Sequence, residues 1–187
     1  MKSKLTNLID PKDKKITFNM SLCIIFLTMI FGGIFGFIYE ELFYKIDLGY
    51  FVKRGSTYGP WIPVYAFGAL FICLFLYRLK HKPWFIIILS TVITFLMEYG
   101  TGWYFLKFQG VRLWDYNTEI WNFGNINGFV CLRSVLLFTV ASVFSIYLVI
   151  PIFIKLAKKI NKKVLYIVSY SLIILFILDI IIWGIMH

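Results

Sequence analysis

Histidine and cysteine are scarce in this chain, which has two of the first and three of the second. The cysteines, Cys23, Cys73 and Cys131, lie far apart, so a dedicated Cys/His metal site is not expected. Each lies within or beside an apolar run, which predicts small buried side chains. The Walker A, GxSxG and HExxH patterns are also missing. The sequence therefore predicts no metal site and identifies no cofactor.

Charged residues are scarce too. They make up 15% of the chain, against about a quarter in soluble domains. Hydrophobic residues reach 60%, and the mean hydropathy is +0.82. This composition is typical of an integral membrane protein. With 187 residues, we expect a single membrane domain over residues 1–187 and no separate soluble domain.

Five apolar segments are long enough to cross a hydrocarbon layer of ~30 Å at ~1.5 Å per residue. They cover residues 18–44, 61–79, 83–107, 129–154 and 164–186. They predict an all-α fold, a polytopic bundle of about five transmembrane helices in the cell (inner or plasma) membrane. A basic segment at residues 1–17 precedes the first span.

The basic residues predict how the chain is oriented in the membrane. Thirteen of the 19 Lys and Arg residues fall in three alternate segments, 1–17, 78–82 and 155–163. Because cytoplasmic loops carry such an excess, we expect the N-terminus inside and the C-terminus outside. The net charge of +10 follows this pattern, which argues against a nucleic-acid partner. The loops at 51–60 and 109–128 would then share the extracytoplasmic side.

The first of these outer loops follows two glutamates. Glu40 and Glu41 end the first span, and Gly32 and Gly36 precede Glu40 on one helical face, where another helix could approach closely. Arg54 lies in the loop itself, just before two glycines and two prolines that predict a non-helical entry to the second span. Irregular backbone at membrane depth must be satisfied by protein or water. A re-entrant or cavity-lining segment is therefore one interpretation of this loop.

Glu98 is the strongest single candidate for a functional residue. Polar or small side chains recur at every fourth position of the third span, at Ser90, Thr94, Glu98 and Gly102. A carboxylate about fifteen residues into a span lies past the midplane, where it normally faces the bundle or a water-filled pocket. Such a group needs a partner, and the candidates are Arg54, Arg112 and Arg133. A structural salt bridge is the alternative interpretation.

The second outer loop is rich in aromatic, Asn and Gly residues, which predicts a folded cap more than a tether. The candidate site residues in it and at its flanks are Trp103, Arg112, Trp114, Asp115, Tyr116, Asn122 and Arg133. The aromatic rings could instead anchor the loop among lipid headgroups, and the arginine at the start of the fourth span could snorkel there. Asp179 stands alone in the apolar fifth span, and we favour a structural role for it.

Several short motifs follow one another between about residues 20 and 150. They are Gly36-Phe-Ile-Tyr-Glu-Glu41, Lys53-Arg-Gly55, Tyr58-Gly-Pro60 with Pro63-Val-Tyr65 and Gly68, Glu98-Tyr-Gly-Thr-Gly-Trp103, Leu113-Trp-Asp-Tyr116, Asn122 and Gly128-Phe-Val-Cys-Leu132. In these motifs the chain resembles a bacterial family of integral membrane proteins described as putative ABC-transporter type IV (CmpB-like). The resemblance implies a multi-span membrane protein that serves as the permease part of a transporter.

The preferred functional hypothesis is an integral membrane transport component, permease-like, with an extracytoplasmic polar site built from the glutamates, the arginines and the Trp-Asp-Tyr loop. Its expected partners are the lipid bilayer and either a nucleotide-binding subunit or further copies of the chain. One alternative is a membrane-embedded enzyme acting on lipid or cell-envelope substrates at the outer leaflet, with carboxylates and Arg as acid, base and anion clamp. The other is a non-catalytic membrane sensor or assembly factor. The sequence leaves open whether the chain is an enzyme.

Overall fold

The computed structural model of the chain describes residues 8, 9, 13 and 15–186. None of these residues forms a strand, and one isolated bridge joins Ile126 to Val130. Of the expected basic N-terminal segment, residues 1–7, 10–12 and 14 lie outside the described part of the chain.

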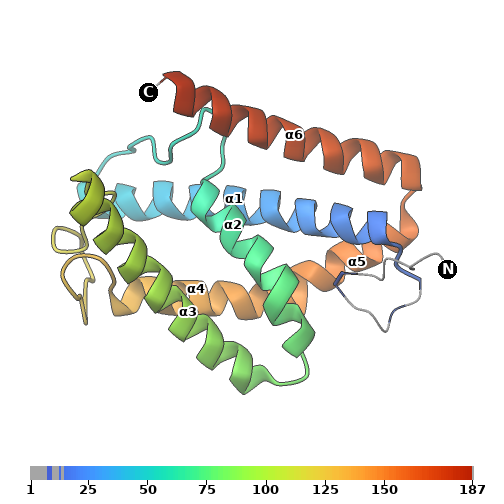
Figure 1. Ribbon diagram of the computed structural model, residues 1–187, viewed down its shortest axis with the longest axis horizontal. Coiled ribbons are helices and arrows are strands. Elements are labelled where there is room, and N and C mark those ends of the chain that lie inside the picture. Colours follow the sequence, from blue (N-terminus) through green and yellow to red (C-terminus); the bar gives the residue numbers. More distant parts are fainter. Residues whose placement is uncertain (1–7, 10–12, 14, 187) are drawn as a thin grey trace. The chain divides into compact units, whose positions relative to one another are not determined.

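The helices follow one another along the chain as Figure 1 shows. They are α1 (Phe18–Leu48), α2 (Pro63–Phe71), α3 (Pro83–Tyr104), α4 (Leu132–Phe144), α5 (Ile150–Lys159) and α6 (Lys162–Met186). Three of them continue into a π-helical stretch, with hydrogen bonds from residue i to i+5. These stretches are Ile72–Leu76 after α2, Phe105–Gln109 after α3 and Ser145–Val149 between α4 and α5, and a 3₁₀ turn at Tyr77–Leu79 follows the first of them.

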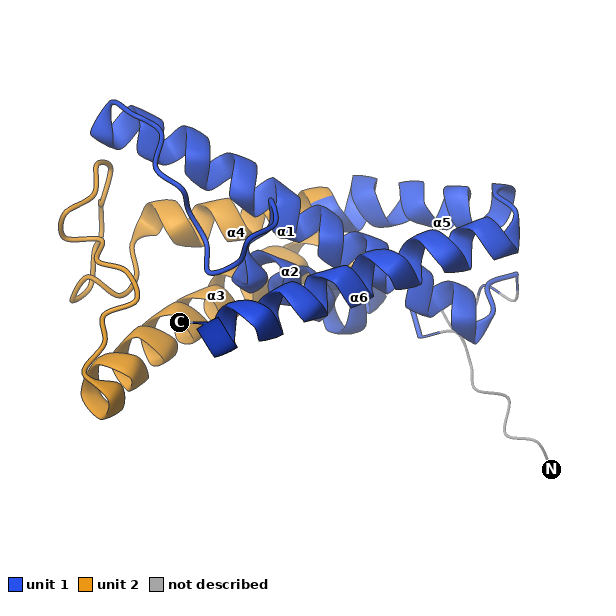
Figure 2. Cartoon of the chain, turned by 90° about the horizontal axis from the view of Figure 1, so that it is seen from above, with its two compact units in different colours: residues 1–80, 145–187 blue, residues 81–144 orange. Residues whose placement is uncertain are grey.

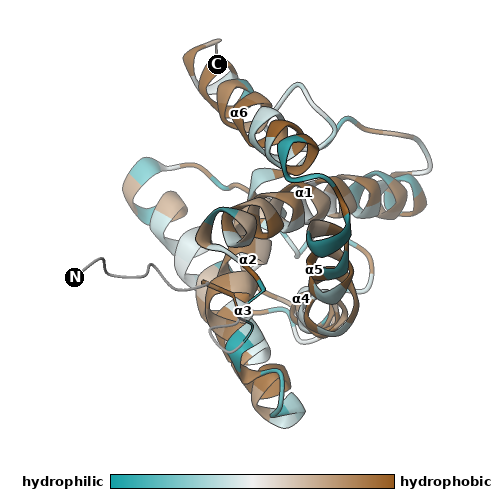
Figure 3. Ribbon diagram, turned by 90° about the vertical axis from the view of Figure 1, so that its right-hand side faces the viewer, coloured by the Kyte–Doolittle hydropathy of each residue, from teal (hydrophilic) through white to brown (hydrophobic). Residues whose placement is uncertain are grey.

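Four of the described helices are long and apolar enough to cross a membrane. They are Phe18–Leu48, Pro83–Gln109, Leu132–Lys159 and Lys162–Met186, and the apolar helix Pro63–Leu79 is shorter. Figure 3 shows how much of the helical ribbon consists of hydrophobic residues, with α6 among the most apolar parts. The prediction of an all-helical, polytopic membrane protein is confirmed.

Local sequence explains where these helices begin and end. The Thr17 hydroxyl accepts a hydrogen bond from the Met20 N–H (3.3 Å) and caps the start of α1. Gly49, with a φ of 84°, ends α1 in the left-handed conformation that glycine adopts without strain. Pro63 and Pro83 occupy the first turns of α2 and α3, where the missing N–H has no helical acceptor to lose.

Residues 1–80 and 145–187 form one compact unit, drawn in blue in Figure 2, in which α1 packs against α2, α5 and α6. The glycines of α1 allow the approach of α2. A Cβ atom at Gly32 would lie 2.7 Å from the Ala69 Cβ, and one at Gly36 would lie 2.2 Å from the Tyr65 ring. The sequence signal of small residues four positions apart therefore marks the α1–α2 contact.

Residues 81–144 form the second compact unit, drawn in orange in Figure 2, in which α3 packs against α4. A loop of 22 residues, 110–131, connects the two helices. Gly102 lets the loop end come close, because a Cβ there would lie 2.8 Å from the Phe129 ring. The single membrane domain expected over residues 1–187 remains a prediction.

Candidate functional site

Glu98 of α3 is bonded to two hydroxyl groups. Its Oε1 accepts a hydrogen bond from the Tyr116 phenol at 3.0 Å, and its Oε2 accepts one from the Ser134 hydroxyl at 2.6 Å. Tyr116 comes from the 110–131 loop and Ser134 from the first turn of α4. One carboxylate in a membrane span therefore joins two helices and the loop between them.

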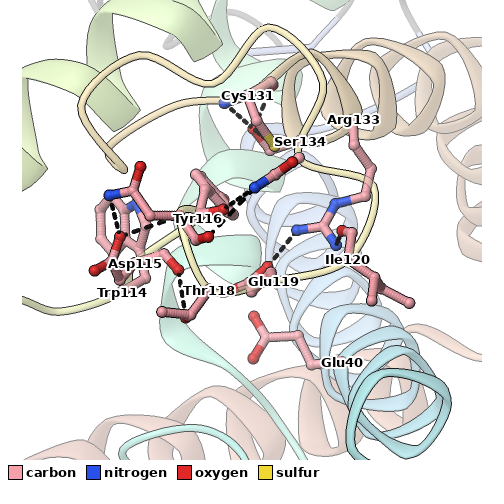
Figure 4. Close-up of polar contacts among 12 residues, drawn as sticks. Glu40, Trp114, Asp115, Tyr116, Thr118, Glu119, Ile120, Cys131, Arg133 and Ser134 are labelled. Atoms are coloured by element: carbon pink, nitrogen blue, oxygen red, sulfur yellow. Dashed lines mark hydrogen bonds and ion pairs between the residues drawn. The ribbon is translucent and has the colours of Figure 1, made fainter.

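Ser134 also belongs to the start of α4 (Figure 4). Its Oγ lies 2.8 Å from the Cys131 carbonyl oxygen and 3.3 Å from the Cys131 N–H. The single hydroxyl proton thus has two acceptors in reach, the carboxylate of Glu98 and this carbonyl. The Cys131 N–H donates to the Ser134 oxygen, so this side chain in the first turn of α4 accepts from the backbone N–H before the helix, as in a capping box.

Tyr116 is held so that its hydroxyl faces Glu98. Burial, and then the nearby Glu98 carboxylate, raise the pKa of the Tyr116 phenol far above its usual range. The Asn122 side chain donates to the Tyr116 carbonyl at 3.0 Å, and the Trp114 indole N–H donates to the Phe129 carbonyl at 2.8 Å. The phenol therefore remains a proton donor to Glu98 throughout the neutral pH range.

Arg133 turns back onto the loop. It forms a salt bridge with Glu119 and donates to the Ile120 carbonyl at 3.2 Å (Figure 4). The side chains of this pair are only 16% and 7% exposed, and the guanidinium also lies over the Tyr116 ring, 5.5 Å from its centroid. Because breaking a buried pair leaves an uncompensated charge, this contact fixes the loop to the start of α4.

Arg112 pairs within the loop rather than with α3. It forms a salt bridge with Asp115 at 2.6 Å, donates to the Asn127 carbonyl at 3.2 Å, and lies 5.1 Å from the Phe129 ring centroid. The Asn117 backbone N–H, at 3.0 Å, is the main cause that lowers the pKa of Asp115 below its ordinary value. The Trp-Asp-Tyr motif thus supplies both a loop contact and the Glu98 donor.

Asparagines complete the folded cap. Asn125 donates to the Asn117 side chain at 2.7 Å and accepts from the Gly128 N–H at 2.9 Å, and the Tyr116 N–H donates to the Gly128 carbonyl at 3.0 Å. Gly128 has a φ of 75°, and a Cβ there would meet Arg112 at 2.3 Å. Asn117, Asn125 and Gly128 were not among the predicted site residues. The density of Asn and Gly in the loop is the signal that marks them.

The first outer loop forms a second polar cluster, in the other compact unit. The Arg54 guanidinium contacts the Glu40 carboxylate at 3.2 Å, and the Arg54 backbone N–H donates to Glu41 at 3.0 Å. The guanidinium also lies 3.8 Å from the centroid of the Tyr44 ring. Both predicted glutamates at the end of the first span therefore bind the same residue.

Asp179 of α6 is not isolated. Its carboxylate accepts hydrogen bonds from the Tyr58 N–H (2.9 Å), the Gly59 N–H (2.8 Å) and the Trp61 indole N–H (2.7 Å). These donors precede Asp179 by about 120 residues in sequence. An acidic residue in an apolar span indicates that a hydrogen-bond or ion-pair partner lies nearby, but the sequence does not identify that partner.

The structure brings some predicted site residues together and separates others. For Glu98, the hydrogen-bond donors among the described residues are hydroxyls, whereas the three candidate arginines bond to Glu40, Asp115 and Glu119. Trp103 is exposed, and its ring centroid lies 4.9 Å from the Lys107 ammonium. The Glu98 cluster and the Arg54 cluster belong to different units, so a single site containing both remains a prediction.

The chemistry open to the Glu98 cluster is proton and hydrogen-bond exchange in an apolar surrounding. Within the described part of the chain, no group of three or more His, Cys, Asp or Glu residues lies close enough to hold a metal ion. The three cysteines are free and buried. A carboxylate flanked by two hydroxyls can instead accept a proton, or exchange one hydroxyl partner for a polar group of a ligand.

Comparisons with known proteins identify the family. A family model described as putative ABC-transporter type IV matches residues 24–183, which is most of the chain. No curated protein and no solved structure matches it. The chain therefore belongs to the putative ABC-transporter type IV family, a family of transporter-related proteins, and is itself a multi-pass membrane protein.

Proposed function

We propose that the chain is the permease-like component of a membrane transporter, with a polar site on the extracytoplasmic side centred on Glu98. The main support is the position of this carboxylate inside a membrane span, bonded to the hydroxyls of Tyr116 and Ser134. Ionisable residues in spans are costly and commonly mark pathways for substrates, ions or protons.

Because its partners are neutral hydroxyls, Glu98 can exchange these hydrogen bonds for a proton or for a polar group of a ligand. A neutral hydroxyl releases a carboxylate at a lower cost than an arginine does, because no buried counter-ion is left behind. Glu98 can then take up a proton or contact a polar group of the transported molecule while Tyr116 and Ser134 shift. The loop salt bridges of Arg112 and Arg133 hold the surrounding cap in place during this exchange.

An uptake experiment tests the role of Glu98. Small molecules and ions whose uptake falls in a strain lacking the chain are identified first, and Glu98→Gln, Glu98→Asp and Tyr104→Phe are then tested by complementation. We expect Glu98→Gln to lose uptake by at least about tenfold, the order of one lost charge-assisted contact. Tyr104, an exposed tyrosine of α3, serves as the control and should leave uptake unchanged. Normal uptake in a folded Glu98→Gln chain would refute the proposal.

A second experiment addresses the energy source. The intact chain is purified from its own membranes, and co-purifying proteins are examined for a nucleotide-binding subunit. With such a partner, uptake should require ATP and survive collapse of the proton gradient. If coupling runs through a proton on Glu98, uptake should instead follow the pH gradient. Uptake that depends on neither would contradict a transporter of this kind.

A further inference from the structure

The segment between α1 and α2, residues 50–62, is here called the strap. From the end of α1 it returns toward the middle of that helix, where α2 begins (Figure 1). After Gly49 ends the helix, Arg54 meets Glu40 and Glu41, and the Ile62 N–H donates to the Gly33 carbonyl at 3.0 Å. Gly33 lies fifteen residues before the end of α1, which corresponds to about 22 Å of helix.

The first residues of α2 therefore lie beside the middle of α1 and not beside its end. The apolar helix Pro63–Leu79 spans about 25 Å by helical rise, shorter than a hydrocarbon layer of ~30 Å. Its first turn packs beside the middle of α1, because a Cβ at Gly33 would lie 3.1 Å from the Trp61 Cβ and 3.4 Å from the Ala66 Cβ. The strap therefore fills the part of the layer that α2 does not cross.

The depth of the strap in the hydrocarbon layer can be counted along two helices, α1 and α6, and both counts agree. Counted from Phe18, the ~20 residues of α1 that cross the layer end near residue 37, which places Gly33 about 6 Å inside the outer edge. Counted from Val164, after the lysines that start α6, the layer ends near Trp183, which places Asp179 about 6 Å inside. The strap bonds to both residues. From these two counts we infer that its Tyr58–Ile62 portion lies within the hydrocarbon region.

Irregular backbone at that depth must find hydrogen-bond partners in the protein or in trapped water. Asp179 supplies them, since it accepts the N–H groups of Tyr58 and Gly59 and the indole N–H of Trp61. Thr57 is only 1% exposed, and its hydroxyl donates to the Trp61 carbonyl at 2.6 Å. Without the Asp179 carboxylate, the freed N–H groups would need water at membrane depth.

We propose that the strap is a re-entrant gate, closed in this structure, and that Asp179 is the latch that holds it closed. Release of the three donors from Asp179 lets water follow the strap into the membrane between α1, α2 and α6. Gly55, with a φ of 87°, and Gly59-Pro60 allow the backbone to bend where a helix could not. The gating role rests on the transport function proposed above, whereas the depth and the latch do not.

Cysteine labelling in intact membranes tests the position of the strap. Cys23, Cys73 and Cys131 are first replaced by Ala, and a membrane-impermeant thiol reagent is then applied to single-cysteine chains. Tyr50→Cys, at a position 63% exposed beyond the end of α1, should react fast. Ile174→Cys should not react, because this position is exposed in the middle of the apolar span α6, where it faces lipid. Thr57→Cys should react at least about tenfold more slowly than Tyr50→Cys, because its site is buried and directly precedes the portion of the strap placed within the hydrocarbon region. Equal rates at positions 50 and 57 would overturn the re-entrant position.

The latch is tested by adding Asp179→Asn to the Thr57→Cys chain. The labelling rate should rise by about tenfold or more, the order expected for loss of charge-assisted hydrogen bonds. Ser171→Ala, at an exposed serine of the same helix, is the matched control and should leave the rate unchanged. Trp61→Phe removes one of the three donors and should give a smaller rise, which keeps the test decisive if Asp179→Asn fails to fold. An unchanged rate in both folded variants would overturn the latch.

Uptake measured on the same variants separates the two proposals. Faster labelling in Asp179→Asn with altered uptake supports the gate. If Asp179→Asn speeds labelling but even the wild-type chain transports nothing, the Asp179 latch is supported and the proposed transport function is refuted. Faster labelling with wild-type uptake would refute the gating role and leave a structural latch.

Discussion

At the scale of single residues, the hydroxyl of Tyr116 has the clearest energetic role. Among the described residues it is one of two hydrogen-bond donors to Glu98, the other being the Ser134 hydroxyl, and its side chain is partly buried. Hydrogen bonds to charged groups contribute about 1.5–3 kcal/mol each, more than bonds between neutral partners. The cost of removing this hydroxyl is therefore measurable.

Tyr116→Phe should lower the free energy of unfolding by about 1–3 kcal/mol, because one oxygen of Glu98 loses its donor while the ring still packs. Tyr104→Phe, at a tyrosine 48% exposed, should change it by less than about 0.5 kcal/mol. Denaturant or thermal unfolding in detergent measures both. Equal stability of the two variants would show that the Tyr116–Glu98 bond does not stabilise the fold.

Asp115 links the stability of the loop to pH. Its pKa in the folded chain lies below the ordinary value of about 3.9, chiefly through the Asn117 N–H and also through Arg112. The stabilisation from this carboxylate is therefore complete above about pH 4 and is lost as the pH falls through the lower folded pKa. Asp115→Asn should flatten the loss of near-ultraviolet circular dichroism, to which Trp114 contributes, between about pH 4 and pH 2. An identical acid profile in both chains would contradict this assignment.

At the scale of helices, the α1–α2 contact depends on missing side chains. A Cβ at Gly36 would enter the Tyr65 ring, whereas a Cβ at Gly68 of α2 meets nothing within 4 Å. The two glycines therefore form a matched pair. Both lie within helices of the same unit, and they differ in the space around them.

Gly36→Ala should destabilise the chain by about 1–3 kcal/mol through overpacking against Tyr65. Gly68→Ala should be neutral or stabilising by up to about 1 kcal/mol, because alanine is the better helix former. Thermal unfolding of both variants in the same detergent makes the comparison. A similar loss at both positions would indicate a general intolerance of alanine and not a close helix contact.

The helices themselves could be predicted because long apolar segments in a membrane have few alternatives to a helix. Gly55, Gly59, Pro60 and Pro63 likewise predicted the irregular entry to the second span. Partnerships between distant segments could not be predicted in this way. Asp179 bonds to residues about 120 positions earlier, and the tertiary packing of α6 against α1 and against the rings of Tyr58 and Trp61 brings them together.

The partner of Glu98 shows the same limit. The sequence predicted an arginine as this partner, since opposite charges attract most strongly in an apolar medium. Arg133 is next to Ser134 in sequence, but neighbouring residues on a helix point about 100° apart, so only one of them faces α3. The serine takes that place, and the arginine bonds to Glu119.

At the scale of the whole molecule, the distribution of Lys and Arg predicts an N-terminus inside the cell and a C-terminus outside. A green fluorescent protein fused before residue 1 should therefore fluoresce, and alkaline phosphatase fused after residue 187 should be active. The reverse fusions, with each reporter at the other end, should be silent. Active phosphatase at the N-terminal end would invert the orientation and place the strap on the cytoplasmic side.

The π-helical stretch Ser145–Val149 has a consequence for chain length. Such a turn holds one residue more than an α-helical turn, so a one-residue deletion inside it can restore a regular helix while both flanks keep their faces. The same deletion within α5 would rotate every later residue by about 100° and carry Lys158 away from Asp13, its salt-bridge partner. Related chains should accordingly show single-residue gaps between Phe144 and Ile150 and an ungapped alignment through Lys159.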